Sequence, residues 1–357
     1  MEIFGFIEST FSILLLFTVV VFIHELGHYW VARRCGVVVD VFSVGFGREI
    51  AGFTDKAGTR WRFAIVPLGG YIKMRGDENA ASMPSGDAKS LSGSFENARL
   101  GAKMAIIAAG PIANFLLAIL LFAVVYMGVG KAFIPADVSE VLPNSAAEQA
   151  GLIEGDRILS VDGRTIRGFA DLRGAVFESP GKELDLTIDR AGQTIPISVI
   201  PESIWNEELS LNIGRLGVVS SGGEWRRLGA AEAIGTATVD TFYMTSNFLR
   251  GLGRMVTGDI QRGEIGGPVR IAELTSDAWK QGITAFTVFM ALISINLGLM
   301  NLLPIPPLDG GHLLFFFIEA ATGRPVPDAI KLQVMRLGIA FVLSLMVVVT
   351  FFDILSV

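Results

Sequence analysis

The sequence has a single cysteine, Cys35, among 357 residues, and only three histidines. One cysteine cannot form an intramolecular disulfide, and it excludes a zinc site built from several thiolates. A transition-metal site in this chain must therefore use histidine and carboxylate side chains. Lysine and arginine are also few, 29 against 35 aspartates and glutamates, so we expect no basic surface for nucleic acid.

Charge of either sign is sparse, because 18% of the residues are charged and 51% are hydrophobic, with a mean hydropathy of +0.53. This composition excludes an ordinary soluble domain and predicts a membrane protein with several spans. The acidic residues concentrate in residues 135–202, which carry twelve acidic and six basic side chains. We expect one soluble module there. The N-terminus lacks the basic start of a secretory signal, so the first span is expected to be retained.

Four stretches are apolar and long enough to cross a bilayer, for which about 20 residues suffice. We place them within residues 1–34, 99–130, 282–312 and 337–357, with polar loops over 35–98 and 313–336. The predicted fold is a polytopic α-helical membrane protein with one soluble α+β module over residues 131–220. Residues 221–281 show amphipathic helical patterns, which favour helices on the membrane surface over a fifth span.

Basic residues near the span ends gather on one predicted side of the membrane. They follow the first span, precede the second and separate the third from the fourth: Arg33, Arg34, Arg99, Lys103, Arg324, Lys331 and Arg336. Because such residues favour the cytoplasmic side, we expect both termini and the soluble module to lie outside. In a Gram-negative cell this is the periplasm. A fifth span within residues 221–281 would reverse the direction in which the third span crosses the membrane. Asp309 would then lie on the opposite side of the bilayer from His24 and His28, which is a further argument for surface helices.

The first span contains the sequence His24-Glu-Leu-Gly-His28. Two histidines four residues apart on a helix lie on one face and can bind a single metal ion. Glu25, between them, can take a proton from a metal-bound water. Ionisable groups in an apolar span are costly, so their presence favours a functional site over a chance match.

A catalytic zinc site needs a third protein ligand and an open position for water. The third span ends in Asn301-Leu-Leu-Pro-Ile-Pro-Pro-Leu-Asp309-Gly-Gly-His312. The first and third spans are expected to run in the same direction, which brings this end into the leaflet of the two histidines. From residue chemistry alone, Asp309 and His312 are both candidate ligands.

Two further regions have recognisable patterns. Residues 37–72 are rich in Val, Phe and Gly, and the alternation at Trp61, Phe63 and Ile65 predicts strands and a hairpin; residues 77–94 resemble a flexible loop. The run from Pro143 to Gly163 resembles a bacterial PDZ domain, a fold that binds extended peptides by adding a strand to a sheet edge.

Three motifs in order resemble the site-2 intramembrane metalloproteases, peptidase family M50. They are the His24 to His28 motif, Gly110-Pro111 with Asn114 in the second span, and the Asn301 to Gly310 segment. From its residue type, Asn114 fits either a helix–helix contact or a role at the site. The layout resembles the bacterial RseP branch, although the best-known members of that branch carry two PDZ domains and this chain has room for one.

The resemblance implies a Zn²⁺-dependent endopeptidase of the inner membrane, with its active site near the cytoplasmic leaflet. It implies that Glu25 is the catalytic residue and that Asp309, not His312, is the third metal ligand. It also implies a membrane re-entrant hairpin whose edge pairs with an unwound substrate helix, which has unsatisfied amides in lipid. The implied substrate-binding residues are Asn296, Asn301, Gly69, Gly70 and Ile72.

The implied substrates are single-span membrane proteins, such as trimmed anti-sigma factors and remnant signal peptides, with a peptide or substrate contact at the PDZ domain. Two other functions remain open. One is a membrane-anchored zinc peptidase that acts on soluble or unfolded chains. The other is a non-catalytic PDZ scaffold or transporter, against which the complete set of His24, Glu25, His28 and Asp309 argues.

Overall fold

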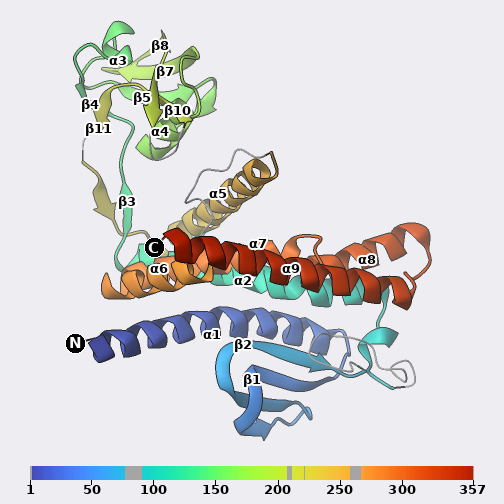
Figure 1. Cartoon of the computed structure of the whole chain (residues 1–357). Coiled ribbons are helices and arrows are strands. Elements are labelled where there is room, and N and C mark those ends of the chain that lie inside the picture. The colour runs from blue at the N-terminus through green and yellow to red at the C-terminus, as the bar shows by residue number, and fades with distance from the viewer. Residues whose placement is uncertain (1, 77–90, 207–210, 221, 258–266, 357) are drawn as a thin grey trace. The chain divides into compact units, whose positions relative to one another are not determined.

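The computed structural model describes residues 2–76, 91–206, 211–220, 222–257 and 267–356 (Figure 1). The chain forms two compact units. The first comprises residues 1–125, 229–258 and 265–357, and the second comprises residues 126–228 and 259–264. Residues 77–90 of the predicted flexible loop lie outside the described residues.

Four helices in the described part of the chain are long and apolar enough to cross a membrane. They are α1 (Glu2–Arg34), α2 (Leu100–Gly128), α7 (Ile283–Leu302) and α9 (Asp328–Ser356). The prediction of four such helices is confirmed. The last one begins at Asp328 rather than at residue 337, because its first turns are polar: Lys331 Nζ lies 3.3 Å from Asp328 Oδ1. A search for apolar runs misses such turns.

The predicted third span, residues 282–312, is not one helix. Helix α7 ends at Leu302, and a separate helix, α8 (Asp309–Thr322), begins at Asp309. Prolines at 304, 306 and 307 cause the break, since a proline lacks the N–H of the helical ladder and its ring clashes with the preceding turn. Gly310 allows the chain to fold back tightly, because a Cβ there would collide with the carbonyl oxygens of Leu302 and Leu303.

The predicted amphipathic region contains α5 (Ala230–Thr257) and α6 (Pro268–Lys280), and neither is among the candidate spans of the described residues. Helix α6 packs on α1, where Ser9 Oγ and Ser276 Oγ lie 2.7 Å apart. The ring of Trp279 stands edge-on between those of Phe11 and Phe286. Both helices belong to the first unit, which also contains α1, α7, α9 and most of α2.

The predicted strands of residues 37–72 form β1 (Val39–Thr54) and β2 (Arg60–Met74). Strand β1 bends, so that residues 41–44 are paired on one side with 60–63 and on the other with 70–73, while 49–54 pair with 60–64. The order across the sheet is therefore 49–54, 60–64, 39–44, 70–74. This order makes residues 70–74 an outer edge of the sheet.

The second unit is an α+β structure, as predicted. Its strands are β3 (Lys131–Phe133), β4 (Val138–Val141), β5 (Arg157–Val161), β6 (Arg164–Thr165), β7 (Leu184–Arg190), β8 (Gln193–Val199), β9 (Glu202–Asn206), β10 (Leu211–Arg215), β11 (Val218–Ser220) and β12 (Glu224–Arg226). Its helices are α3 (Ala146–Gln149) and α4 (Phe169–Phe177). The main sheet has the order β6-β5-β7-β8, and β11 pairs with β4. Strand β12 pairs with β3 inside a region predicted to be helical.

A buried ion pair supports the core of the second unit. Asp156 is fully buried, and its two carboxylate oxygens accept from the Arg190 guanidinium at 2.7 and 2.8 Å. Burial opposes ionisation, but Arg190 and the Ile153 N–H hold the pKa of Asp156 below its ordinary value. A carboxyl with a lowered folded-state pKa stabilises the fold above its unfolded pKa of about 3.9, and this contribution is lost as the pH falls toward the folded-state pKa.

We expect Arg190→Met to reduce the free energy of unfolding of the second unit by about 3–5 kcal/mol at pH 7, because it leaves a buried carboxylate unpaired. The loss of unfolding free energy should be smaller at pH 3 than at pH 7, because the unpaired Asp156 of the variant becomes protonated there and loses its charge. Hydrogen exchange of the full chain at both pH values measures it. Arg173→Met, at an exposed arginine on α4, is the control. An equal loss at pH 7 and pH 3 would contradict the ion-pair explanation.

Candidate active site

Helix α1 places His24 and His28 one turn apart on the same face. Both are buried, at 7% and 6% exposure, on a helix of which most other described residues are only partly buried or exposed. Their Nε2 atoms lie 3.1 Å apart, and their rings meet edge to face. The two imidazoles therefore converge on one point, as the spacing predicts.

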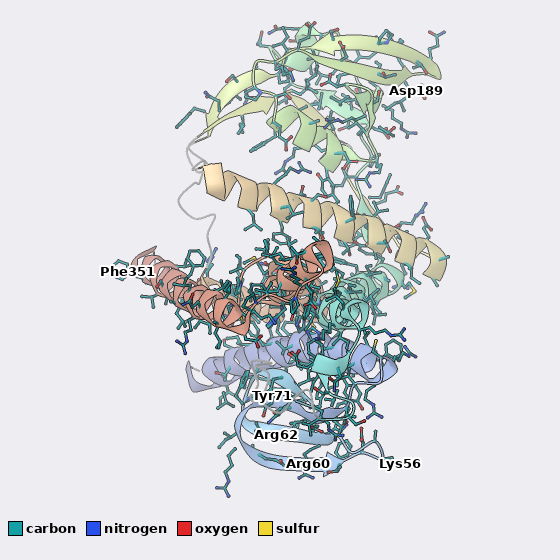
Figure 2. All side chains as sticks on the ribbon, turned by 90° about the vertical axis from the view of Figure 1, so that its right-hand side faces the viewer. Lys56, Arg60, Arg62, Tyr71, Asp189 and Phe351 are labelled. Carbon is teal, nitrogen blue, oxygen red and sulfur yellow. The ribbon has the colours of Figure 1, made fainter. Side chains whose placement is uncertain are left out.

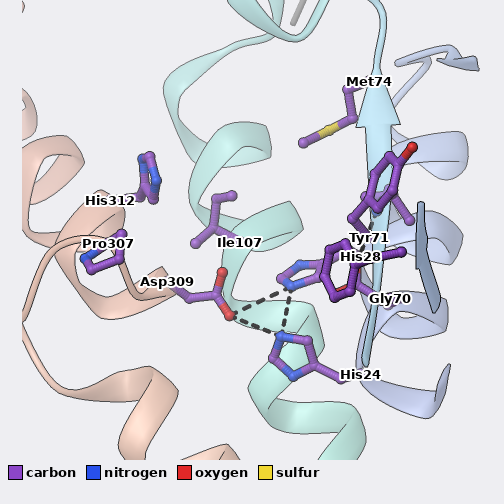
Figure 3. Close-up of a pocket in the computed structure, with 12 residues that line it drawn as sticks. His24, His28, Gly70, Tyr71, Met74, Ile107, Pro307, Asp309 and His312 are labelled. Atoms are coloured by element: carbon purple, nitrogen blue, oxygen red, sulfur yellow. Dashed lines mark hydrogen bonds and ion pairs between the residues drawn. The ribbon is translucent and has the colours of Figure 1, made fainter. Parts of the chain in front are cut away.

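Asp309, the first residue of α8, completes this group. Its Oδ2 lies 3.1 Å from His24 Nε2 and 3.5 Å from His28 Nε2 (Figure 3). The three ligand atoms lie within 4.8 Å of one another. The break between α7 and α8 thus brings a carboxylate to the two histidines.

The donor set fits zinc. Asp309 Oδ2 is buried and has no hydrogen-bond partner among the described residues, although both imidazole nitrogens face it. His28 Nδ1 lies 2.8 Å from the carbonyl oxygen of Ile106, which can only accept, so Nδ1 carries the proton and Nε2 is free to bind metal. Two imidazole nitrogens and a carboxylate oxygen are the three protein ligands of many catalytic zinc sites.

The close approach of α2 to α1 depends on two glycines. A Cβ on Gly110 would collide with the His28 ring, and a Cβ on Gly27 would collide with the carbonyl oxygen of Ala109. Pro111 follows directly inside α2. Small residues let membrane helices approach closely, and here they bring α2 against the imidazole.

Glu25 faces a cavity of about 180 Å³ beside the metal group. Its Oε2 accepts a hydrogen bond from the Ile72 N–H at 3.1 Å, on the outer edge of the β-sheet. The cavity is lined by residues of α1, α2, α8 and the β-sheet: His24, Glu25, His28, Phe46, Gly70, Tyr71, Ile72, Met74, Ile107, Pro307, Asp309 and His312. The carboxylate of Glu25, the three candidate metal ligands and the edge of the β-sheet therefore line the same cavity.

Comparison with known proteins assigns the family. Peptidase family M50 matches residues 12–345. The chain belongs to this family. A protein of Agrobacterium fabrum named as a zinc metalloprotease is 39% identical over 360 residues, covering 96% of this chain and 94% of its own length. One of Rhizobium meliloti, named likewise, is 41% identical over 356 residues, with 96% and 95% covered.

Metalloprotease MmpA of Caulobacter vibrioides is 36% identical to this M50 chain over 376 residues and covers 96% of it and 94% of its own length. Among solved structures, the PDZ domain of the SdrC-like protein from Listeria monocytogenes is 13% identical, with a TM-score of 0.21, and covers 26% of this chain and 93% of that chain. The chain is therefore a zinc metalloprotease of family M50.

The structure of this M50 protease separates the predicted site residues. It brings together His24, His28 and Asp309, whereas His312 lines the cavity one turn farther along α8 and is not in the metal group of the described residues. Of the predicted substrate-binding residues, Gly70 and Ile72 line the cavity. The other three, Gly69, Asn296 and Asn301, are not among its lining residues.

Several lining residues of the M50 site were not predicted. Phe46 and Tyr71 are there because of how β1 bends, and Ile107 is there because α2 crosses α1 at Gly110. Phe46 and Ile107 do not differ from core residues in sequence. Tyr71 alone carried a signal, since it lies between the two predicted edge residues Gly70 and Ile72.

Proposed function

We propose that this M50 protease cleaves peptide bonds within the membrane-spanning segments of single-span proteins. The observation that carries the proposal is the position of the metal group, since His24 and His28 lie inside α1, a helix long and apolar enough to span a bilayer. Ionisable groups at membrane depth are retained where they do chemistry.

The geometry of the site supports a role for each residue. His24, His28 and Asp309 hold the zinc ion, which when bound polarises the scissile carbonyl and lowers the pKa of its water. Glu25 would act as the general base for the attacking water and then as the general acid for the leaving amine. The Ile72 N–H holds the Glu25 carboxylate toward the cavity in which the peptide bond has to lie.

The outer edge at residues 70–74 is the proposed docking site for the substrate strand. Backbone groups alternate in direction along a strand, so those of Gly70 face the same side as the Ile72 N–H that contacts Glu25. A membrane helix unwound for cleavage has amides without partners, and this edge supplies partners beside the base. Asn296 and Asn301, about 7.5 Å apart along α7, stay predicted contacts for the rest of an extended substrate.

We infer that the site lies near the cytoplasmic leaflet. Trp30 is 59% exposed, and the Arg34 guanidinium lies 3.8 Å from the centre of its ring. Exposed tryptophan with lysine or arginine marks the membrane–water interface, and a basic excess marks its cytoplasmic side. His28 is two residues away, about 3 Å along the helix. With this orientation, both termini and the second unit are periplasmic. The second unit is proposed to be a PDZ domain that contacts the substrate.

The β-sheet is proposed to associate with the membrane beside the site. Phe53, Phe63 and Ile65 are all more than half exposed, which is unusual for a surface in water. Figure 2 shows Tyr71 at the end of the sheet next to α1, and Arg60, Arg62 and Lys56 farther from that helix. Apolar and basic side chains on one small sheet suit the boundary between acyl chains and anionic headgroups.

The experiment is reconstitution of the full chain with zinc in vesicles, together with single-span peptides that carry or lack a bulky outer domain. We expect cleavage inside the span, greatest for the trimmed peptides. A soluble peptide without an apolar span serves as the comparison. Cleavage of the soluble peptide alone would overturn the proposal and favour the membrane-anchored peptidase of soluble chains.

A further inference from the structure

Asn114 of α2 contacts His24 from the side opposite the metal group. It is 0% exposed, and its Nδ2 lies 3.2 Å from His24 Nδ1. Its Oδ1 is buried and has no hydrogen-bond partner among the described residues. A buried amide oxygen without a donor costs free energy, so its position has to be explained.

The backbone of Asn114 is held independently of this amide. Ser294 Oγ on α7 donates to the Asn114 carbonyl oxygen at 2.8 Å. A Cβ on Gly298 would lie 3.2 Å from Asn114 Cβ, so α7 also packs closely against this residue. The amide is therefore delivered to His24 by the packing of two membrane helices.

The tautomer of His24 decides how this amide must be turned. An imidazole that binds metal through Nε2 carries its proton on Nδ1, and that N–H needs an acceptor. An amide NH₂ group cannot accept, whereas the amide oxygen can. The two ends of an asparagine amide are similar in size, so half a turn exchanges them and gives Oδ1 the donor that it lacks.

We propose that Asn114 is a positioning residue for the metal ligand His24. In the zinc-loaded protein its Oδ1 accepts the His24 Nδ1–H, which fixes the tautomer and the direction of the ring. Without metal the His24 proton lies on Nε2, facing Asp309 Oδ2 at 3.1 Å, and the Asn114 NH₂ donates to the bare Nδ1. When zinc is bound, the His24 proton would lie on Nδ1 instead of Nε2, and the Asn114 amide would be turned by half a turn.

With this assignment, each of the two histidines donates its Nδ1–H to an oxygen of α2. The Ile106 carbonyl oxygen accepts from His28 Nδ1, and the Asn114 amide oxygen accepts from His24 Nδ1, so α2 orients both imidazoles. The inference rests on the proposed role of His24 as a ligand. It does not depend on which peptide is cleaved, so a failure of the intramembrane proposal would leave it standing.

The test compares zinc affinity and thermal unfolding of the full chain in detergent for three variants. Asn114→Leu removes the acceptor, and we expect zinc affinity to fall by about 10–100-fold, the usual loss for such outer partners. Asn114→Asp keeps an acceptor and should bind zinc within a few-fold of the original. Thr287→Val removes only a hydrogen bond within α7, from Thr287 Oγ1 to the Ile283 carbonyl oxygen, and should leave zinc affinity unchanged. Wild-type zinc affinity in Asn114→Leu would overturn the proposal.

A second measurement needs no substitution. With only three histidines in the chain, ¹⁵N-histidine NMR can resolve each imidazole in the zinc-loaded and metal-free protein. We expect the His24 proton on Nδ1 with zinc and on Nε2 without it. A His24 Nδ1 that carries no proton in the zinc-loaded protein would overturn the proposal, even if a variant failed to fold.

Discussion

Glu25→Gln is expected to lower the cleavage rate by about 10²–10⁴-fold, the contribution usual for a general base. Glutamine has nearly the same shape and can still accept the Ile72 N–H, so the side chain should stay in place. It cannot take a proton from water. Zinc content and unfolding temperature should therefore match those of the original protein, and turnover under saturating substrate is the measurement.

Glu8→Gln provides the matched control, because Glu8 lies on the same helix and is not among the residues that line the cavity. It should cleave at the original rate. If Glu25→Gln also retained the original turnover while binding zinc, another group would have to act as the base. Loss of zinc in Glu25→Gln would instead assign Glu25 to the metal group.

Gly110→Ala is expected to abolish both zinc binding and cleavage. Its methyl group would occupy the position of the His28 ring, and the neighbouring backbone of α2 cannot move away without breaking its contact with α1 at Gly27. Displacement of a ligand should cost more than the 10–100-fold typical of an outer partner. Zinc content by atomic spectroscopy measures the loss, with peptide cleavage as the second readout.

Gly101→Ala is the control for this prediction, since a Cβ at Gly101 meets nothing within 4 Å and lies on the same helix. It should bind one zinc ion and cleave normally. Full zinc occupancy in Gly110→Ala would show that α2 and His28 can separate, and the close helix crossing would then not be needed for the site.

Much of the molecule follows from local sequence. The long, predominantly apolar runs of α1 and α2 predict helices that end within two residues of the observed ends. The spacing of His24 and His28 is a property of one helix, and it predicts their convergence directly. The strands of the β-sheet are also predicted by local alternation.

What could not be predicted depends on contacts between distant segments. Alternation at Trp61 and Phe63 indicates a strand but not that residues 39–44 lie between two parts of β2. Prolines predict that a helix ends, but not that the chain folds back through Gly310 and starts α8 at Asp309. Asn114 shows the limit most clearly, because a polar residue in a span fits a packing role or a site role equally well until its neighbour is known.

Three hydrogen bonds, spaced along α1, attach the β-sheet to this helix. Thr18 Oγ1 donates to the Pro67 carbonyl oxygen at 3.1 Å, Glu25 accepts from Ile72, and Tyr29 donates to Asp55 at 3.0 Å. Thr18 and Tyr29 are about 16 Å apart along the helix, so the attachments resist a hinge between helix and sheet.

The facing wall of the cavity is α8, which follows a segment without a helical ladder. A substrate strand that widens the cavity is therefore expected to displace α8 rather than the sheet. Asp309 moves with α8, so zinc affinity should change when substrate binds. Occupancy of the metal and occupancy of the peptide are then thermodynamically linked, and each will alter the other by the same factor.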